Sequence, residues 1–242
     1  GALFQGYSFN RLQSDGCASR VCRLRPESLA SMEFGNDYWR RGGNLGGSVN
    51  LVLASGSPRR RELLHSLGWS FRIDVPDICE DLLPGEGPEE AARRLSRAKA
   101  AEAAARNPGA LVVAADTLVA AGGVILGKPS CREESLRMLR MLSGAVHSVF
   151  TGVALRRGEE ERFAVEETRV EFRPLSEESM KLYVESGEGD DKAGAYAIQG
   201  RGALLVSSLH GDYFNVVGLP LCRLSRLLEE FGCSLADQWR NS

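Results

Sequence analysis

The chain has 242 residues, of which 43% are hydrophobic, and its 30 basic and 32 acidic side chains leave a formal net charge of −2. This length favours one α/β domain of roughly 190 residues with an extension. The near-neutral charge argues against binding nucleic acid or a membrane through bulk electrostatics. No apolar run reaches the ~18 residues of a membrane span and no signal peptide is recognisable, so we expect a cytoplasmic protein. Any anion-binding site must be local.

The six cysteines and three histidines are scattered along the chain. They form no C-x-x-C pair and no metal-ligand spacing, which indicates reduced thiols rather than a zinc site. Against 26 arginines the chain has only four lysines, at positions 99, 128, 181 and 192. In a chain so rich in arginine, a lysine is a candidate for a compact, rotatable charge in a binding site.

The domain organisation follows from a change in pattern near residue 49. Residues 1–48 have no sustained hydrophobic period and end in a glycine-rich linker sequence. We expect them to be an N-terminal extension or linker outside the catalytic fold. We expect residues 49–235 to form the folded domain and residues 236–242 to be a C-terminal tail.

From residue 50 the sequence alternates between strand and helix patterns. Apolar runs predict strands at 51–54, 71–75, 111–120, 124–126, 146–156, 162–173, 196–198 and 204–208. Amphipathic spacing, N-caps and glycine stops predict helices at 58–67, 88–107, 130–143, 176–186 and 220–231. Hairpins set among helical crossovers indicate an α/β fold, with a mixed sheet and flanking helices.

The stretch from Leu53 to Arg60 reads Leu-Ala-Ser-Gly-Ser-Pro-Arg-Arg, so an apolar strand runs into a small-residue turn and a helix start. Pro58 suits the first helical position and Ser57 suits the N-cap. The free amides and the helix dipole then face the turn, where Arg59 and Arg60 add guanidinium groups suited to phosphate oxygens. Taken alone, the segment fits either an anion site or a capped surface helix with solvated arginines.

Three charged residues further along suggest chemistry at the same place. Asp116 lies in the middle of an apolar strand, where a carboxylate needs a cation, hydrogen bonds or a metal. Lys128, in Gly-Lys-Pro, follows across the expected hairpin and could reach the same point. Glu80, in the acidic loop 77–81, is a second candidate metal ligand. The alternatives are a strand-end aspartate that reaches solvent and a solvated loop acid.

Residues 190–200 combine charges, small residues and a glutamine. The amide of Gln199 can both donate and accept hydrogen bonds, as reading the edge of a nucleobase requires. An ordinary strand with a glutamine at its exposed end is the alternative. Together with the arginines and lysines, the acids imply a phosphate substrate with Mg²⁺, because hard carboxylate oxygens suit that ion.

Six segments, in this order, resemble the Maf family of nucleoside triphosphate pyrophosphatases. They are Leu-Ala-Ser-Gly-Ser-Pro-Arg-Arg at 53–60, Ala-Asp-Thr at 115–117, Gly-Lys-Pro at 127–129, His-Ser-Val-Phe-Thr-Gly-Val at 147–153, Asp-Lys-Ala-Gly-Ala-Tyr-Ala-Ile-Gln-Gly at 191–200 and Asn-Val-Val-Gly-Leu-Pro-Leu at 215–221. The resemblance implies a hydrolase that cuts nucleoside triphosphates between the α- and β-phosphates, yielding a monophosphate and pyrophosphate. It further implies Mg²⁺ or Mn²⁺, removal of non-standard or surplus nucleotides, and an inosine-triphosphatase-like fold of two lobes with a central cleft.

The resemblance also implies roles for single residues. It implies that Asp116, Glu80 and Lys128 are catalytic, and that Glu80 and Asp116 hold the metal. The implied substrate-binding residues are Ser55, Ser57, Arg59, Arg60, Lys99, Thr117, Lys192 and Gln199. The segment 191–200 resembles the branch of the family that acts on dTTP and UTP, although Ala197 stands where glycine is common.

The mechanism we expect is electrostatic, since phosphoryl chemistry needs little covalent work from the protein. Asp116, or a metal-bound water that it orients, would deliver hydroxide to the α-phosphorus. Arg59, Lys99 and Lys128 would offset the developing charge. The rival interpretations are a nucleotide-binding regulator of cell division and septum formation without turnover, and a nucleotidyltransferase. The sequence leaves open the preferred base and the oligomeric state, a homodimer included.

Overall fold

Strand β4 (Leu111–Ala121) lies at the centre of the sheet and connects its parts. The computed structural model describes residues 10–11 and 50–240. In this part of the chain the strands pair in the order β1-β5-β4-β6-β7-β8, and β2 joins β4 while β3 joins β2. The strands are β1 (Asn10–Arg11), β2 (Leu51–Ala54), β3 (Arg72–Ile73), β5 (Val124–Leu126), β6 (Val146–Arg157), β7 (Glu160–Phe172) and β8 (Val206–His210).

Pairing along β4 creates an opening in the sheet. Strand β2 runs parallel to residues 111–114 of β4, and β5 runs antiparallel to residues 119–121 on the same edge. The carboxyl ends of β2 and β5 therefore point toward each other along this edge of β4. Between them, residues 115–118 of β4 have no described strand partner on that edge. Loops that leave β2 and β5 consequently meet over the middle of β4.

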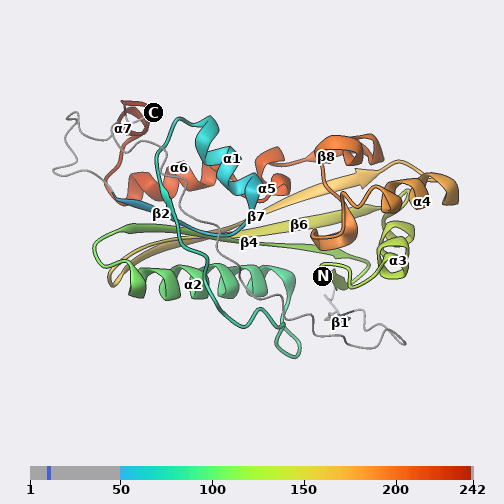
Figure 1. Ribbon diagram of the computed structural model, residues 1–242, viewed down its shortest axis with the longest axis horizontal. Coiled ribbons are helices and arrows are strands. Elements are labelled where there is room, and N and C mark those ends of the chain that lie inside the picture. The colour runs from blue at the N-terminus through green and yellow to red at the C-terminus, as the bar shows by residue number, and fades with distance from the viewer. Residues whose placement is uncertain (1–9, 12–49, 241–242) are drawn as a thin grey trace, which may run out of the picture.

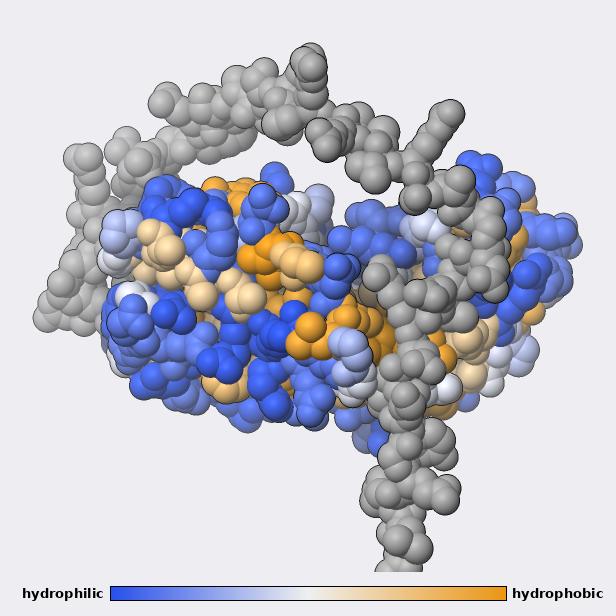
Figure 2. Space-filling model, turned by 90° about the horizontal axis from the view of Figure 1, so that it is seen from below, coloured by the Kyte–Doolittle hydropathy of each residue, from blue (hydrophilic) through white to orange (hydrophobic). Residues whose placement is uncertain are grey.

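Helices cover both faces of the sheet (Figure 1). Helix α2 packs under β4 and β6, whereas α1, α5 and α6 lie on the opposite face and α3 and α4 lie near one end. The helices are α1 (Pro58–Ser66), α2 (Pro88–Arg106), α3 (Arg132–Leu142), α4 (Glu177–Glu185), α5 (Tyr213–Val217), α6 (Leu221–Glu230) and α7 (Leu235–Arg240). The described surface on the α2 side is mostly hydrophilic (Figure 2), which agrees with the charged outer face of that helix.

Alternation along the strands divides the interior into two main cores. Leu53 and Val113 belong to the core on the α1 side, whereas Val52 and Val112 pack against the alanines of α2. This follows from the two-residue period of a strand, which sends neighbouring side chains to opposite faces. The mixed α/β sheet with flanking helices is thus confirmed.

Helix α2 approaches the sheet closely at Gly152 of β6. A Cβ built on Gly152 would lie 2.1 Å from the carbonyl oxygen of Ala92 and 2.6 Å from Oγ of Ser96. Only glycine leaves room for the helix backbone at this point. The contact fixes how far α2, and the side chains that it carries, stand from β4.

Several local expectations need correction. The strand expected at 196–198 is wrong: these residues are irregular and lie between two 3-10 turns, Ala193–Ala195 and Gly200–Leu205. The backbone turns there at Gly194 and Ala195, which have φ of 73° and 58°, and a strand cannot continue through such angles. Helices α5 and α7 were not expected.

The two ends of the chain differ from the middle in what is described. The extension expected at 1–48 lies outside the described residues, except that Asn10–Arg11 pairs with β5. Residues 235–240, most of the expected tail, form α7. Its Gln238 is buried, and its carbonyl oxygen accepts a hydrogen bond from the indole of Trp69 at 3.3 Å.

Candidate active site

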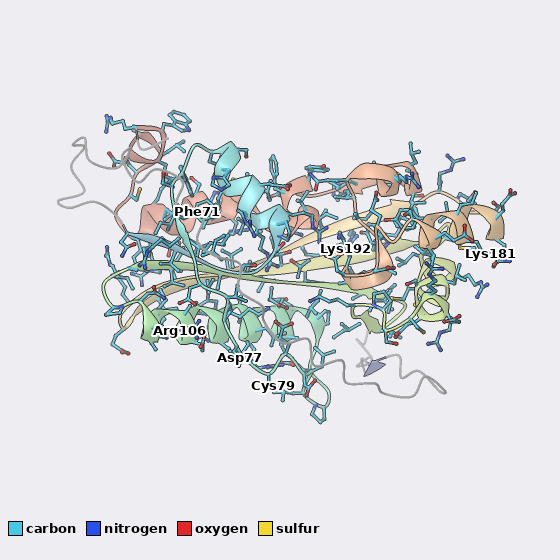
Figure 3. All side chains as sticks on the ribbon, viewed as in Figure 1. Phe71, Asp77, Cys79, Arg106, Lys181 and Lys192 are labelled. Carbon is cyan, nitrogen blue, oxygen red and sulfur yellow. The ribbon has the colours of Figure 1, made fainter. Side chains whose placement is uncertain are left out.

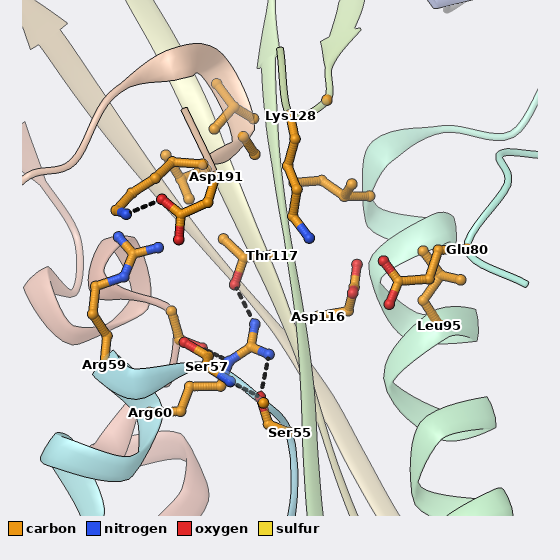
Figure 4. A pocket seen from close by; sticks show the side chains of 18 of the residues that line it. Ser55, Ser57, Arg59, Arg60, Glu80, Leu95, Asp116, Thr117, Lys128 and Asp191 are labelled. Atoms are coloured by element: carbon orange, nitrogen blue, oxygen red, sulfur yellow. Dashed lines mark hydrogen bonds and ion pairs between the residues drawn. The ribbon is translucent and has the colours of Figure 1, made fainter. Parts of the chain in front are cut away.

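A cavity of about 650 Å³ opens over the unpaired middle of β4. Its wall includes the turn after β2, the start of α1, the loop after β5, the loop that carries Glu80 and the loop around Lys192. All but one of the sequence-predicted site residues line it: Ser55, Ser57, Arg59, Arg60, Glu80, Lys99, Asp116, Thr117, Lys128 and Lys192. Figure 4 shows that these groups come from both faces of the sheet.

Adjacent residues of β4 serve the two faces. Asp116 continues the series of Val112 and Ala114, which face α2, and Thr117 continues the series of Val113 and Ala115 on the α1 side. The strand period therefore sends the carboxylate to one face and the hydroxyl to the other. We call the part of the site on the α2 side, with Asp116, Glu80 and Lys99, the acid half. The part on the α1 side, with Thr117, Ser55 and Arg60, is the cation half.

The acid half consists of two carboxylates around one ammonium group. Lys99 Nζ of α2 donates to Asp116 Oδ1 at 2.6 Å and lies 2.7 Å from Glu80 Oε1. Asp116 and Lys99 are buried, whereas Glu80 is half exposed. Burial opposes ionisation of Glu80, but Lys99, Lys128 and Arg60 outweigh it and lower the pKa of this carboxyl. Among described residues, Asp116 Oδ2 has no hydrogen-bond donor.

The cation half is organised by Arg60. Its guanidinium donates from Nε to the Gly218 carbonyl oxygen at 2.7 Å, and to the hydroxyls of Ser55 and Thr117 at 3.2 and 3.0 Å. Burial lowers the pKa of Arg60, and the negative charge of Asp116 offsets only part of this shift. The guanidinium nevertheless keeps its charge, as arginines do in proteins. Arg60 thus ties the turn after β2 to β4 and to the end of α5.

The turn itself forms the expected helix start. Ser57 occupies the N-cap and Pro58 the first position of α1. The Ser57 side chain makes no capping bond, and its amide donates to Ser55 Oγ at 3.2 Å. The start of α1 borders the cavity, so the free backbone amides of its first turn can bind an anion there.

Four further charged side chains border the cation half. Arg59 forms no hydrogen bond among described residues, and burial is the main cause that lowers its pKa. The Asp191 carboxylate lies beside the Arg59 guanidinium (Figure 4) and pairs with Lys192. Burial raises the pKa of Asp191, but Lys192 and Arg59 together bring it below its usual range. Lys128 is exposed and points in from the loop after β5.

The structure departs from the expected site in two respects. Gln199 is half-buried and does not line the cavity. Lys99, expected to bind substrate, is already bonded to the two acids. Sequence reasoning also missed Asp191 and the apolar end of the cavity, although Asp191 stands beside Lys192 in a segment that had drawn notice. By the apolar end we mean the lining residues that belong to the main core on the α1 side: Val119, Val149, Tyr196, Ile198, Val216 and Val217.

An aromatic cluster supports the apolar end from behind. The hydroxyl of Tyr196 lies 2.8 Å from Nε2 of the buried His147, and the rings of both pack edge to face with Phe172. Burial lowers the pKa of His147 to about 4, so the ring is neutral at pH 7. Its Nδ1 has no partner among described residues. The ring therefore acts as a packed core group.

The donor set fits a hard cation. The carboxylates of Glu80 and Asp116 both form ion pairs with one cation, the Lys99 ammonium group. Mg²⁺ commonly takes one or two carboxylates and completes its shell with water and substrate phosphates. Within residues 10–11 and 50–240 no cluster of three or more His, Cys, Asp or Glu is placed to hold a metal ion.

Fold and site together define an α/β protein with a cavity in which arginine and lysine side chains and two carboxylates face each other. The Maf-like protein family matches residues 50–231. The chain belongs to the Maf family.

Relatives in the same family are similar over most of their length. The chain is 53% identical over 182 residues to a protein of Symbiobacterium thermophilum named dTTP/UTP pyrophosphatase, covering 75% of this chain and 94% of that one. It is 53% identical over 192 residues to a Myxococcus xanthus protein of the same name, covering 79% and 96%. A Bacillus velezensis protein, also so named, is 46% identical, covering 75% and 96%.

Among solved structures, a HAM1 protein from Coxiella burnetii matches with a TM-score of 0.35 and 22% identity, over 51% of this chain and 73% of that one. Such a match is too weak to bear on the expected inosine-triphosphatase likeness. In the described part of the chain, no helix combines the length and apolarity that crossing a membrane requires.

Proposed function

We propose that this protein hydrolyses dTTP and UTP to the monophosphate and pyrophosphate. The observation that carries the proposal is the pairing of halves in one cavity. On one face of β4, Asp116 and Glu80 share the Lys99 ammonium, and on the other face the adjacent Thr117 accepts a hydrogen bond from Arg60 of the turn after β2. Hydrolysis of a triphosphate needs cations that bind its phosphates and a carboxylate beside the α-phosphorus that can accept a proton from water. The names of the relatives support the same substrates. The proposed active domain is residues 49–235, acting in the cytoplasm.

In the proposed reaction the phosphates bind to the turn formed by residues 55–60 and to the ammonium group of Lys128. Asp116 accepts the proton of the attacking water, through the oxygen Oδ2 that Lys99 does not occupy. The water oxygen bonds to the α-phosphorus, the bond from that phosphorus to its bridging oxygen breaks, and pyrophosphate leaves. Most of the rate enhancement would come from fixed charges that stabilise the transition state.

A divalent cation completes the proposal. Glu80 and Asp116 would hold Mg²⁺ or Mn²⁺, and the bound ion would neutralise phosphate charge. Lys99, between the two acids, would keep both carboxylates aimed at this point and limit their mutual repulsion. Arg59, which has no hydrogen bond among described residues, would be available to the phosphate oxygens.

The apolar end of the cavity suits a flat nucleobase. Val149, Ile198 and Val217 line it, and Tyr196 is held in place by His147. Ligand sites of this kind are mostly apolar, with a few polar groups that fix orientation. Reading of the base by Gln199 stays a prediction that requires the side chain to turn into the cavity.

The test is a pyrophosphate-release assay with Mg²⁺ or Mn²⁺ over dTTP, UTP, CTP, 7-methyl-GTP and modified pyrimidine triphosphates. We expect the highest kcat/KM for dTTP and UTP, with the monophosphate as the second product. Tight binding of UTP without release of pyrophosphate would favour a regulator instead. Release only in the presence of an acceptor substrate would favour a nucleotidyltransferase.

A further inference from the structure

Glu80 belongs to a long loop rather than to a helix or strand. Residues 74–87, which we call the strap, connect β3 to α2 without regular secondary structure. Figures 1 and 3 show the strap crossing the sheet edge and running along α2, with Asp77 and Cys79 between its ends. A loop of this length needs fixed points if one of its side chains is to stand at a defined place.

The strap is attached to α2 at two points. At its start, Asp74 accepts hydrogen bonds from Arg106 at 2.6 Å and from Asn107, at the carboxyl end of α2. At its end, Arg94 donates to both oxygens of Glu86, from Nε at 2.6 Å and from Nη2 at 2.7 Å. A bidentate pair of this kind fixes direction as well as distance.

Arg94 also reaches the residue that follows Glu80. Its Nη2 donates to the backbone carbonyl oxygen of Asp81 at 2.9 Å. Glu86 in turn accepts the amide of Leu83 at 3.1 Å, so the last part of the strap is folded around its carboxylate. The side chain of Glu86 is only 8% exposed, which strengthens charge-assisted hydrogen bonds relative to a surface pair.

One helix therefore carries both groups that locate Glu80. Lys99 meets its carboxylate directly, and Arg94, five residues earlier on α2, holds the backbone beside it. Glu80 itself is half exposed, and no hydrogen bond to its side chain other than that from Lys99 is present among described residues. Without Arg94 the strap would still be attached at Asp74, six residues before Glu80, but the backbone directly after Glu80 would lose the hydrogen bond that ties it to α2.

We propose that Arg94, together with Glu86, is a positioning residue that sets Glu80 against Asp116 at the reaction site. The proposal rests on the proposed function, in which Glu80 takes part. Arg94 does not line the cavity, and its contribution passes through the strap backbone. Displacing a reacting group by about 1 Å can cost up to about 100-fold in rate, so loosening the strap should lower kcat while leaving the cation half, and hence KM, nearly unchanged.

The variants are Arg94→Ala, Glu86→Gln and Arg94→Lys, with Arg93→Ala as matched control. Arg93 is the neighbouring arginine of α2, and among described residues its side chain pairs with Glu89 alone. We expect kcat for dTTP to fall about tenfold in Arg94→Ala and less in Glu86→Gln, with KM within about twofold. Arg94→Lys should recover part of the loss, because an ammonium can hold one partner but not the fork. Arg93→Ala should match the wild type.

A double-mutant cycle separates positioning from general stability. Arg94→Ala is introduced into Glu80→Gln, and rates are measured with enzyme in excess over labelled dTTP so that slow turnover remains measurable. If Arg94 acts through Glu80, its replacement costs nothing further in that background. An equal loss in both backgrounds, or no loss in the wild-type background, overturns the proposal.

Hydrogen exchange of the full chain keeps the inference apart from the proposed function. In Arg94→Ala, amides of residues 77–83 should exchange faster than in Arg93→Ala, while those of β4 remain unchanged. Unchanged exchange in the strap refutes the positioning role. If the wild type hydrolyses neither dTTP nor UTP, the proposed function fails by itself, whereas faster strap exchange in Arg94→Ala would still uphold the inference that Arg94 fixes the strap beside Glu80.

Discussion

The acid half and the cation half of the site are held in different ways. In the cation half, Arg60 bonds to three groups from separate parts of the fold and sits between packed elements. In the acid half, Asp116 is fixed on β4, but its partner Glu80 stands on the strap. A rigid phosphate cradle and an acid that depends on a loop can be adjusted separately. Substitutions in the acid half should therefore change rate, and those in the cation half should change binding or stability.

Asp116→Asn should have the largest effect on activity. The substitution keeps the shape of the side chain but removes the proton acceptor, so kcat for dTTP should fall about 1,000-fold, within the range found for general bases. Pyrophosphate release measures the rate, and the thermal midpoint controls for folding. Turnover within about threefold of wild type would contradict the role of Asp116.

Gly152→Ala tests whether α2 must stand where it does for the acid half to form. The new Cβ would meet the Ala92 carbonyl at 2.1 Å, so α2 would have to move or the fold would lose about 3 kcal/mol. Urea unfolding measures the loss. Gly56→Ala is the stability control, since its Cβ would meet Val75 at an ordinary 3.6 Å. Equal stability of the two variants would show that the close contact is not required.

Local pattern predicted more of the fold than of the site. The apolar runs at 51–54 and 111–120 were sufficient to place β2 and β4, and the residues Ser57 and Pro58 were sufficient to place the start of α1. The strand expected at 196–198 failed because Gly194 and Ala195 turn the backbone, which apolar runs do not reveal. Family resemblance gave the site residues, but not their partners. The bonding of Lys99 to both acids, and of Arg94 to Glu86, depends on tertiary contacts that no local pattern specifies.

The pH dependence of stability should report the core behind the cation half. His147 is held neutral with a pKa of about 4, below its ordinary 6.5, because it is buried. Between these values the unfolded chain binds a proton that the folded chain excludes. Stability contributed by this group is complete above pH 6.5 and falls as the pH is lowered, by about 1.4 kcal/mol per unit at most, or about 2 kcal/mol between pH 6.5 and 5.

The control for this prediction is His147→Gln, which removes the titration but leaves the carboxylates. The difference in unfolding free energy between the wild type and this variant, followed by urea unfolding from pH 7 to 5, isolates the contribution of the histidine. If both proteins lost stability in parallel, the pKa of His147 would be the same in the folded and the unfolded chain. Its packing behind Tyr196 would then differ from that described here.

Substitutions of Arg60 and Arg59 should have different effects, the first on the stability of the fold and the second on the binding of substrate. Arg60→Lys leaves a single ammonium where a fork met three acceptors, so unfolding free energy should fall by about 1–2 kcal/mol. Arg59→Lys should stay within about 0.5 kcal/mol of wild-type stability, because Arg59 has no hydrogen bond to a described residue, and should raise KM for dTTP with kcat little changed. Urea unfolding and initial-rate kinetics decide. If Arg59→Lys proved the more destabilising of the two, the cradle would be built around Arg59, and Arg60 would be the group left to meet the phosphates.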